Sequence, residues 1–483
     1  MTASATIVAV IAVYLLVLIG IGFWGSGESK DISGYYVGHK RLPAWVIAFS
    51  ANTTGESAWL LLGLTGMGYL VGIHAFWVVL GEVLGVAVAW AFVARPFKEA
   101  TDKYDSITVP DYLEARFGDT RHVIRVISMV IIVTMVTAYT SAQLTASGKA
   151  FSAFLGTSYP TGVLIGAGVI LFYTTVGGFK AVAYSDVLQG VLMFTGLLVL
   201  PIVGITAAGG WMPLMNQLRS LDPALLEPMG SFGFSLAGVL SAVSFAGIGL
   251  AFLGAPQLLT RFISAKDTGA IANGGLIAVV CIIVFDVGAV LSGMAGRALF
   301  PGLADPETIF PTMSAELFPA VFTGIFLVMV LAAIMSTVDS VLILASSAVV
   351  RDVVQKTLGS RASERRLTAY GKLMTVIIGI VALMFAFGEV RALFWFVLFA
   401  WSGLGAAFTP VVLAALFWKG TTRQGAIAGM VVGFLVTVIW VVAFKTDFYD
   451  LYEMIPGFIA GLGTIVVVSL MTGGKAVRRS GGR

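Results

Sequence analysis

The sequence has very few charged residues and almost no cysteine. Only 11% of its 483 residues are charged and 58% are apolar, whereas about a quarter of a typical soluble protein is charged. The single cysteine, Cys281, excludes a disulfide framework and a thiolate metal site. The three histidines are scattered along the chain, so no histidine metal cluster is visible. This composition cannot supply a hydrated surface, and it indicates an all-α polytopic membrane protein whose solvent is mostly lipid.

Long apolar runs predict the membrane helices. A helix needs about 20 apolar residues to cross a bilayer, and runs of this kind, separated by charges or turn signals, number thirteen. They cover residues 4–24, 42–70, 73–94, 123–148, 160–177, 183–208, 233–254, 271–296, 319–348, 369–388, 393–417, 425–444 and 455–472. No Lys or Arg precedes the first run, so we interpret it as a retained helix and not as a signal peptide.

The distribution of Lys and Arg predicts the orientation. With the N-terminus outside, 24 of the 29 basic residues fall in inner loops or the C-terminal tail. Cytoplasmic loops carry an excess of Lys and Arg. The sequence therefore predicts an N-terminus outside and a C-terminus in the cytoplasm.

Two of the predicted helices contain sequences that disfavour a continuous helix. The second contains SANTTGES at residues 50–57, and the seventh contains the Gly-rich AGIGLAFLGAP at residues 246–256. Irregular backbone at membrane depth is tolerated where it lines a cavity or is buried in protein. Paired broken helices at equivalent places in two halves are a pointer to a transporter site. Helices 2–6 and 7–11 would form inverted halves of five helices each; the alternative is ordinary Gly-rich packing.

Five acidic residues lie inside the apolar runs. They are Glu56, Glu82, Asp186, Asp286 and Asp339. A charge at the bilayer centre costs several kcal/mol, so such acids usually face a cavity, pair with another group or bind an ion. No Lys or Arg is expected deep in a helix beside them, which favours cations, protons or hydroxyl groups as their partners.

The segment around Asp339 carries the richest set of oxygen ligands. In LAAIMSTVDSVLILASS, the residues Ser336, Asp339 and Ser340 share one helical face, and Thr337 lies three residues before Ser340. These hard oxygen groups suit an alkali cation. The alternative is that the hydroxyls bond to carbonyls of their own helix, which is common in membrane helices.

The remaining acids and Tyr139 have less specific surroundings. Asp186 could bind an ion, cap its helix or pair with Lys180. Glu82 and Asp286 have no motif around them, and we assign them no function from the sequence. Tyr139, within TAYTSAQ, could line a cavity or be a core aromatic residue.

Six stretches of the sequence resemble the sodium/solute symporter family, and within it the sodium/proline branch. They are WLLLGL, TVPDYLEARF, GGFKAVAYSDVLQ, LAAIMSTVDS, WSGLGAAFTPVVL and IPGFIAG. The resemblance implies a single transporter domain over 1–483 with a leucine-transporter-type five-plus-five inverted repeat. Its parts would be a first helix and inner loop (1–41), repeat one (42–208), repeat two (232–417) and two C-terminal helices with a basic tail (418–483).

The resemblance also implies two sodium sites. The main site would use the carbonyls of Thr53, Glu56 and Ala333 and the hydroxyls of Ser336 and Thr337. A second site would combine Asp186 with Ser336, Asp339 and Ser340. Sodium would be the co-transported ion.

The family pattern places the solute between the second and seventh helices. The corresponding residues here are Asn52, Gly55, Ser57, Tyr139, Ile248, Phe252 and Pro256. The sequence departs from the proline branch in two places. The acid of the second helix has moved one residue, from the position of Gly55 to Glu56, and Ile248 and Phe252 replace a Trp and a Tyr. These departures weaken the assignment of proline more than that of sodium.

The predicted function is sodium-coupled import of a small organic solute by alternating access, with an amino acid such as proline as the expected solute. The expected partners are the solute, sodium and the lipid bilayer, without nucleic acid, and the expected location is the plasma (inner) membrane. Proton coupling, or a small carboxylate as solute, remains an alternative, and a membrane sensor is a further one. No enzymatic motif such as GxGD, a serine-protease GxSG with a histidine base, a zincin sequence or a nucleotide loop accompanies the buried acids, so we expect no enzyme.

Overall fold

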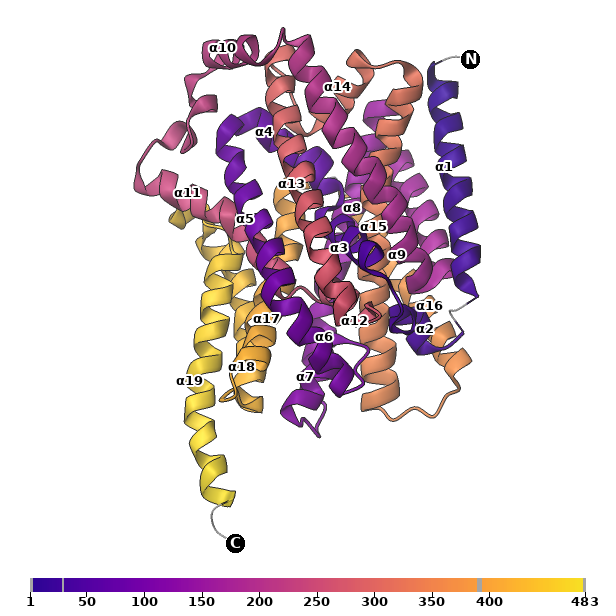
Figure 1. Cartoon of the computed structure of the whole chain (residues 1–483), viewed down its shortest axis with the longest axis vertical. Coiled ribbons are helices and arrows are strands. Elements are labelled where there is room, and N and C mark those ends of the chain that lie inside the picture. The colour runs from indigo at the N-terminus through magenta and orange to yellow at the C-terminus, as the bar shows by residue number, and fades with distance from the viewer. Residues whose placement is uncertain (1–2, 28–29, 389–392, 481–483) are drawn as a thin grey trace.

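The computed structural model describes residues 3–27, 30–388 and 393–480, and these residues form a helical bundle. Helix α1 begins near one end of the molecule and α19 ends beyond the opposite end (Figure 1). The described residues contain no β-strand; Leu42 and Ala265 form an isolated bridge.

The principal helices follow the predicted apolar runs closely. Their bounds are α1 Ala3–Ser26, α2 Ile32–Val37, α3 Ala44–Ala58, α4 Thr65–Val71, α5 Phe76–Val88, α6 Ala94–Lys103, α7 Val109–Phe117, α8 Val123–Leu155, α9 Tyr159–Ala207, α10 Trp211–Leu221, α11 Leu236–Ala246, α12 Pro256–Ser264, α13 Thr268–Leu299, α14 Ile309–Leu317, α15 Ala320–Ser347, α16 Glu364–Ala386, α17 Leu393–Phe417, α18 Arg423–Ile439 and α19 Met454–Ser480.

The predicted number of thirteen membrane helices is not confirmed. Eleven helical stretches of the described residues are long and apolar enough to cross a membrane. One of them, Ala44–Lys103, spans 60 residues and contains two predicted runs. A straight helix of that length would reach about 90 Å, three times the hydrocarbon thickness. Gly72, with φ 56°, interrupts this stretch, and Gly178, with φ 66°, interrupts α9.

Both predicted helix interruptions are present. In α3 the helical path breaks at Ser57, which has φ 55° and ψ −171°, and a π-helical stretch follows at Trp59–Leu64. In the second half, α11 ends at Ala246, a 3-10 segment occupies Gly247–Leu253, and α12 begins after Ala255. The Gly and small polar residues of both segments therefore mark real breaks in the helices.

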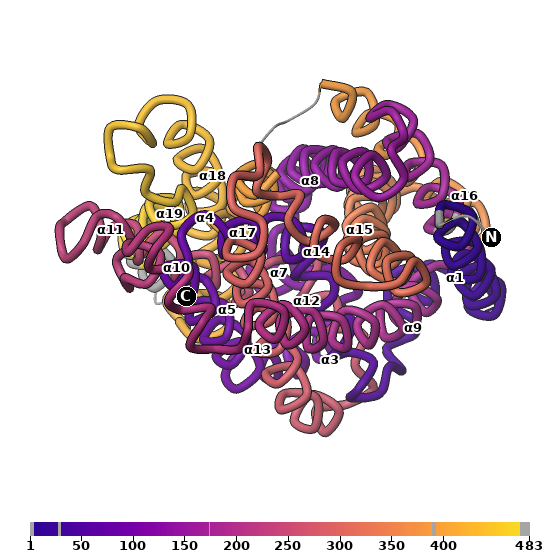
Figure 2. The backbone as a smooth tube through the Cα atoms, turned by 90° about the horizontal axis from the view of Figure 1, so that it is seen from above, coloured from indigo at the N-terminus to yellow at the C-terminus, as the bar shows by residue number. Residues whose placement is uncertain are grey.

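The two breaks lie in the buried interior, where neighbouring backbones approach closely. Helix α3 packs against α9, α13 and α15, and the view from above places α18 and α19 at the periphery (Figure 2). Helix α5 packs against Gly247–Leu253. A Cβ on Gly249 would lie 1.8 Å from the carbonyl oxygen of Gly81. Small residues that admit such contacts are typical of membrane helix interfaces.

Candidate functional site

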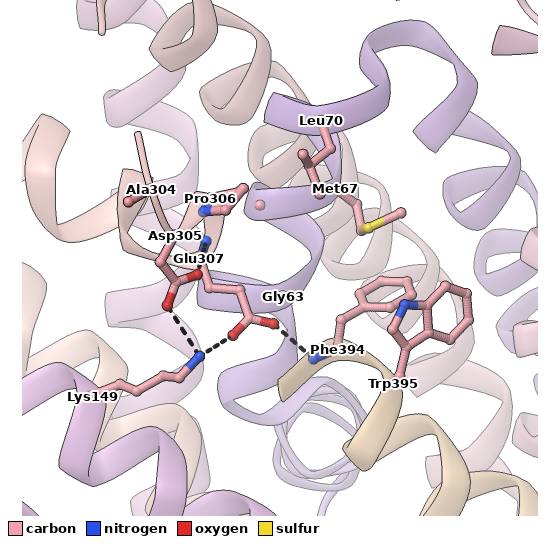
Figure 3. Close-up of a pocket in the computed structure, with 11 residues that line it drawn as sticks. Gly63, Met67, Leu70, Lys149, Ala304, Asp305, Pro306, Glu307, Phe394 and Trp395 are labelled. Atoms are coloured by element: carbon pink, nitrogen blue, oxygen red, sulfur yellow. Dashed lines mark hydrogen bonds and ion pairs between the residues drawn. The ribbon is translucent and has the colours of Figure 1, made fainter. Parts of the chain in front are cut away.

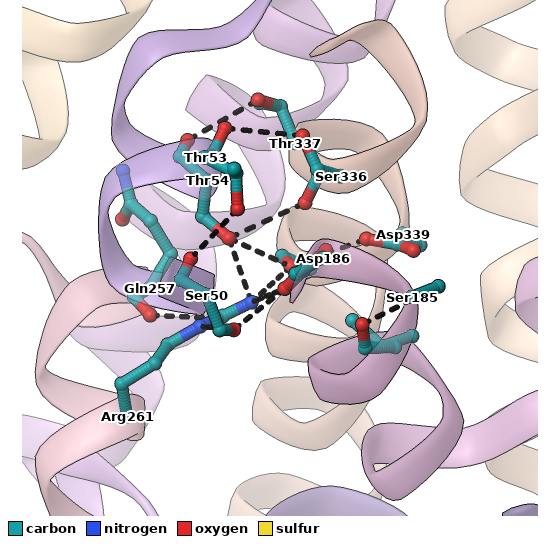
Figure 4. Close-up of polar contacts among 12 residues, drawn as sticks. Ser50, Thr53, Thr54, Ser185, Asp186, Gln257, Arg261, Ser336, Thr337 and Asp339 are labelled. Atoms are coloured by element: carbon teal, nitrogen blue, oxygen red, sulfur yellow. Dashed lines mark hydrogen bonds and ion pairs between the residues drawn. The ribbon is translucent and has the colours of Figure 1, made fainter. Parts of the chain in front are cut away.

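Helices α3 and α15 are joined by hydrogen bonds next to the break in α3 (Figure 4). The Ser336 hydroxyl donates to the carbonyl oxygens of Thr53 (3.0 Å) and Ala333 (3.1 Å). The Thr337 hydroxyl donates to the carbonyl oxygen of Thr54 at 3.2 Å. Four of the five groups predicted for the main sodium site thus lie together in the buried core.

The carbonyl of Glu56, the fifth predicted group, is used locally. It accepts a hydrogen bond from the backbone N–H of Trp59 as the chain passes the break. The oxygens assembled at this junction are carbonyls and hydroxyls without a carboxylate. Hard, uncharged oxygen groups of this kind can replace part of the hydration shell of an alkali cation.

Of the four residues predicted for a second sodium site, Asp186, Asp339 and Ser340 lie near one another with an arginine among them. The fourth, Ser336, bonds to the carbonyls of Thr53 and Ala333. Asp186 accepts a hydrogen bond from the Ser50 hydroxyl at 2.6 Å, and its carboxylate lies 3.3 Å from Nη2 of Arg261. Nη2 also donates to the hydroxyl of Ser340. Asp339 accepts a hydrogen bond from Ser340 at 3.2 Å. Asp186 and Ser340 therefore both contact the Arg261 guanidinium, and Asp339 is hydrogen-bonded to Ser340. Figure 4 shows Asp186, Asp339 and Arg261 in this arrangement.

The expectation that no basic residue lies deep beside the buried acids is wrong. Arg261 is 1% exposed, and the Asp186 side chain is fully buried. The sequence predicts an inner loop at Arg261, because this residue lies between the predicted helices at 233–254 and 271–296. Helix α12 instead follows the second break and carries Arg261 into the core, where it also donates to Thr54 Oγ1 at 2.7 Å. The guanidinium supplies the positive charge that a second sodium ion was predicted to supply.

A small cavity adjoins the break in α3. It is lined by residues from α3, α5, α8, α17 and the 3-10 segment: Gly55, Trp59, Glu82, Tyr139, Ile248, Val397, Leu398 and Trp401. Three of the predicted solute residues, Gly55, Tyr139 and Ile248, are among them. The cavity is about 10 Å³, which is room for about one water molecule. A solute can enter only if the surrounding helices move apart.

The other predicted solute residues do not line this cavity. Asn52 donates to the carbonyl oxygen of Ala278 at 2.6 Å, and Ser57 accepts a hydrogen bond from the backbone N–H of Trp59. Phe252 packs edge-on against Trp401, with ring centroids 5.1 Å apart. Pro256 begins α12. Sequence reasoning did not include Trp59, Glu82 and Trp401 among the solute residues.

Three of the buried acids converge beside the cavity. Glu56, Glu82 and Asp286 come from α3, α5 and α13, and each offers a carboxylate oxygen within 4.8 Å of the others. All three side chains are almost completely buried. This group could hold a cation, a shared proton or a ligand with a positive charge. Since each acid lies alone in its own sequence, no local motif could have indicated the group.

A larger pocket is lined by residues of α4 and of the segment that leads into α14 (Figure 3). Its volume is about 500 Å³, and its lining includes Lys149, Glu307 and Phe394. Glu307 pairs with Lys149 at 2.5 Å and accepts backbone N–H bonds from Leu393 and Phe394. The Phe394 ring stacks on Trp59, with centroids 5.3 Å apart. Because Phe394 lines the pocket and Trp59 lines the small cavity, this stack lies between residues of the two linings.

Ion pairs close the opposite end of the bundle. Arg125 pairs with Asp111 (2.5 Å), Glu114 (2.6 Å) and Asp352 (2.8 Å), which joins α7 and α8 to the segment after α15. Burial opposes ionisation of Asp111, but Arg351 and Arg125 together hold the pKa of its carboxyl below the usual value. This end is therefore held by buried charge pairs, whereas the other end contains the pocket.

The fold matches solved structures of transporters over nearly its whole length. A Na⁺-coupled sialic acid symporter, in a substrate-bound outward-open state, gives a TM-score of 0.81 at 20% identity, over 96% of this chain and 98% of that chain. Mhp1, a nucleobase-cation-symport-1 family transporter, gives a TM-score of 0.59 at 13% identity, over 93% of this chain and 96% of that chain. At these identities the likeness establishes the fold alone. The fold class is the predicted leucine-transporter type, which belongs to membrane transporters.

The family follows from the sequence comparisons. The model of the sodium:solute symporter family matches residues 35–433, and the chain belongs to this family. The high-affinity proline transporter PutP of Bacillus subtilis is 37% identical over 94% of this chain and 95% of its own. The osmoregulated proline transporter OpuE of the same organism is 33% identical over 97% of this chain and 95% of its own. A sodium/proline symporter of Staphylococcus aureus is 35% identical over 96% and 92%.

Proposed function

We propose that this chain is a sodium-coupled symporter that carries proline or a closely related amino acid into the cell. The observation that carries the proposal is the α3–α15 junction, where the hydroxyls of Ser336 and Thr337 meet backbone carbonyls at a helix break. Membership of the sodium:solute symporter family and the names of the three similar proteins support sodium and proline.

The proposed mechanism is alternating access. Sodium at the α3–α15 junction would fix the break in α3 and so pre-organise the neighbouring solute cavity. The coupling is reciprocal, so the solute strengthens sodium binding by the same factor. The pocket beside Glu307 is then the outer entrance, and the Trp59–Phe394 stack is the barrier that must open.

The orientation in the membrane supports import. With the N-terminus outside, 24 of the 29 basic residues fall on the inner side of the predicted topology, and 23 would face the cytoplasm once the buried Arg261 is left out. The closed end with Arg125 would then be the inner end, in the plasma (inner) membrane. An inner negative potential drives sodium inward with about 2.3 kcal/mol per charge for each 100 mV. The repeats would run over 42–208 and 232–417, with 1–41 and 418–483 outside them.

The geometry favours one sodium ion for each solute. Thr53, Ala333, Ser336 and Thr337, with Glu56 nearby, would hold that ion. At Asp186, Asp339 and Ser340 the Arg261 guanidinium already provides the compensating charge. A second ion there would require the arginine to move away.

Uptake into proteoliposomes tests the proposal. Radiolabelled L-proline is offered with an inward sodium gradient, with a pH gradient instead, and with potassium replacing sodium. We expect uptake with sodium only, and loss of sodium stimulation in the Ser336→Ala/Thr337→Ala double variant. Uptake driven equally by the pH gradient would show proton coupling. Sodium-driven uptake of a small carboxylate, without competition by proline, would overturn the amino acid assignment alone.

A further inference from the structure

The carboxyl groups of Glu56, Glu82 and Asp286 form an acidic group without a basic partner. Five of their six oxygens are fully buried and receive no hydrogen bond from the described residues: both of Glu56, both of Asp286 and Oε2 of Glu82. Three carboxylates within 4.8 Å of one another cannot all be charged in the interior unless a cation lies among them. The group therefore points to a positively charged ligand.

Glu82 connects this acidic group to the solute cavity. It lines the cavity directly, together with the aromatic side chains of Trp59, Tyr139 and Trp401. Aromatic faces next to a carboxylate are a favourable environment for an organic cation. The acidic group lies on the α5 and α13 side of the break in α3, whereas the proposed sodium site lies on the α15 side.

A second polar group in the cavity needs an acceptor. Nε1 of Trp59 has no hydrogen-bond partner among the described residues, and Trp59 is only 3% exposed, so water does not replace that partner. A hydrogen-bond donor that is buried without an acceptor is unfavourable, because it has lost its bond to water. A metal ion or a proton at the acids would leave this N–H without an acceptor. A ligand with both a positive and a negative group satisfies the acids and the indole together.

We infer that Glu82 binds the ammonium group of a zwitterionic amino acid and that Trp59 Nε1 donates to its carboxylate. Glu56 and Asp286 are positioning residues: as neutral acids they can each donate a hydrogen bond to a neighbouring carboxylate and keep the net buried charge small. This inference rests on the proposed function and specifies its solute class. It requires a free amino group on every solute that the protein carries.

Half-molecules of proline test the two contacts separately. The full chain, purified in detergent at saturating sodium, is titrated with L-proline, with pyrrolidine as the amine alone, and with cyclopentanecarboxylate as the carboxylate alone. Binding is followed by ligand-induced thermal stabilisation. We expect Glu82→Gln to weaken L-proline binding roughly 10- to 100-fold, since hydrogen bonds to charged groups contribute about 1.5–3 kcal/mol. It should abolish pyrrolidine binding and leave cyclopentanecarboxylate binding unchanged.

Trp59→Phe should give the opposite pattern. It removes the indole N–H and keeps an aromatic ring against Phe394, so cyclopentanecarboxylate binding should be lost and pyrrolidine binding kept. It also keeps the inference testable if Glu82→Gln does not fold. Glu99→Gln is the matched control, because Glu99 is exposed and pairs only with Arg95 one turn away. It should behave like the unmodified chain with all three ligands.

Three results would overturn the inference. Glu82→Gln could weaken both half-molecules equally, or it could lower sodium affinity while leaving proline affinity at saturating sodium unchanged. The second result would make the acids an inorganic cation site. Sodium-driven uptake of a solute without an amino group would also exclude the ammonium contact while leaving sodium symport intact. If uptake by the unmodified chain ignores sodium, the proposed function fails instead, whatever the half-molecules show.

Discussion

Replacing Arg261 by methionine would remove the one positive charge that contacts Asp186 in the core. Methionine fills much of the same volume without charge. In the unmodified chain the guanidinium contacts Asp186 at 3.3 Å, donates to Ser50 at 3.0 Å and to the carbonyl oxygen of Gln257 at 2.9 Å. Both Arg261 and Asp186 are buried. Breaking a buried pair by removing one partner typically costs 3–5 kcal/mol, since the other charge is left uncompensated.

We therefore expect Arg261→Met to lower the free energy of unfolding by about 3–5 kcal/mol in potassium buffer. Sodium should then stabilise the variant more than the unmodified chain, because Asp186, Asp339 and Ser340 lose the competing guanidinium. At one hundred times its dissociation constant, sodium would restore about 2.7 kcal/mol. The double variant Arg261→Met/Asp186→Asn leaves no uncompensated charge at this pair. Its loss in free energy of unfolding should therefore be smaller than the sum of the losses in the two single variants.

Denaturant unfolding of the purified protein in detergent measures these differences, at constant ionic strength with sodium exchanged for potassium. Arg95→Met is the control, since Arg95 and Glu99 form an exposed pair worth at most about 1 kcal/mol. The reasoning would be refuted if Arg261→Met unfolded like the control. Strict additivity in the double variant would also refute it, because residues in one network should couple by about 0.5–3 kcal/mol.

Three further changes test other parts of the structure. Ser336→Ala should lower sodium affinity about tenfold in uptake titrations, since loss of a hydrogen-bonding group costs about 1.5 kcal/mol. Ser347→Ala is the control and should leave sodium affinity unchanged, because the Ser347 hydroxyl donates to a carbonyl of its own helix. Equal effects of the two changes would contradict the proposed sodium site. Gly249→Ala should destabilise the protein by more than about 1–3 kcal/mol, because the added Cβ would lie 1.8 Å from a backbone oxygen. Gly20→Ala is the control, since its Cβ would meet nothing within 4 Å. Thermal unfolding of the two variants measures the difference. The depressed pKa of Asp111 stabilises the fold above its unfolded pKa of about 3.9, and this stability is lost as pH falls through the lower folded value. In Asp111→Asn the free energy of unfolding should therefore fall less steeply as the pH drops below about 4. An unchanged dependence on pH would exclude this contribution.

Local patterns in the sequence were sufficient for the membrane character and for most of the helix positions. Apolar runs report burial in lipid directly, so most helices lie where hydropathy predicts them. Ser336 and Thr337 are recognisable as candidate ligands because they lie with Asp339 and Ser340 within about one helical turn. The breaks in the two helices are also local, since Gly and small polar residues disfavour a continuous helix at each place. The count of crossings is harder, because Gly72 and Gly178 lie inside stretches that are helical on both sides.

Only the tertiary structure could place Arg261 and the acids Glu82 and Asp286. The residues next to Arg261 read as a loop, and its burial depends on how α12 turns back against α3 after a break. Glu82 and Asp286 are single acids in separate apolar helices, and their approach to Glu56 results from the packing of α5 and α13 around α3. A sequence determines which groups a helix carries and on which face. Which groups from distant helices share a buried site is decided by close packing between those helices, and here that packing turned three isolated acids into one site.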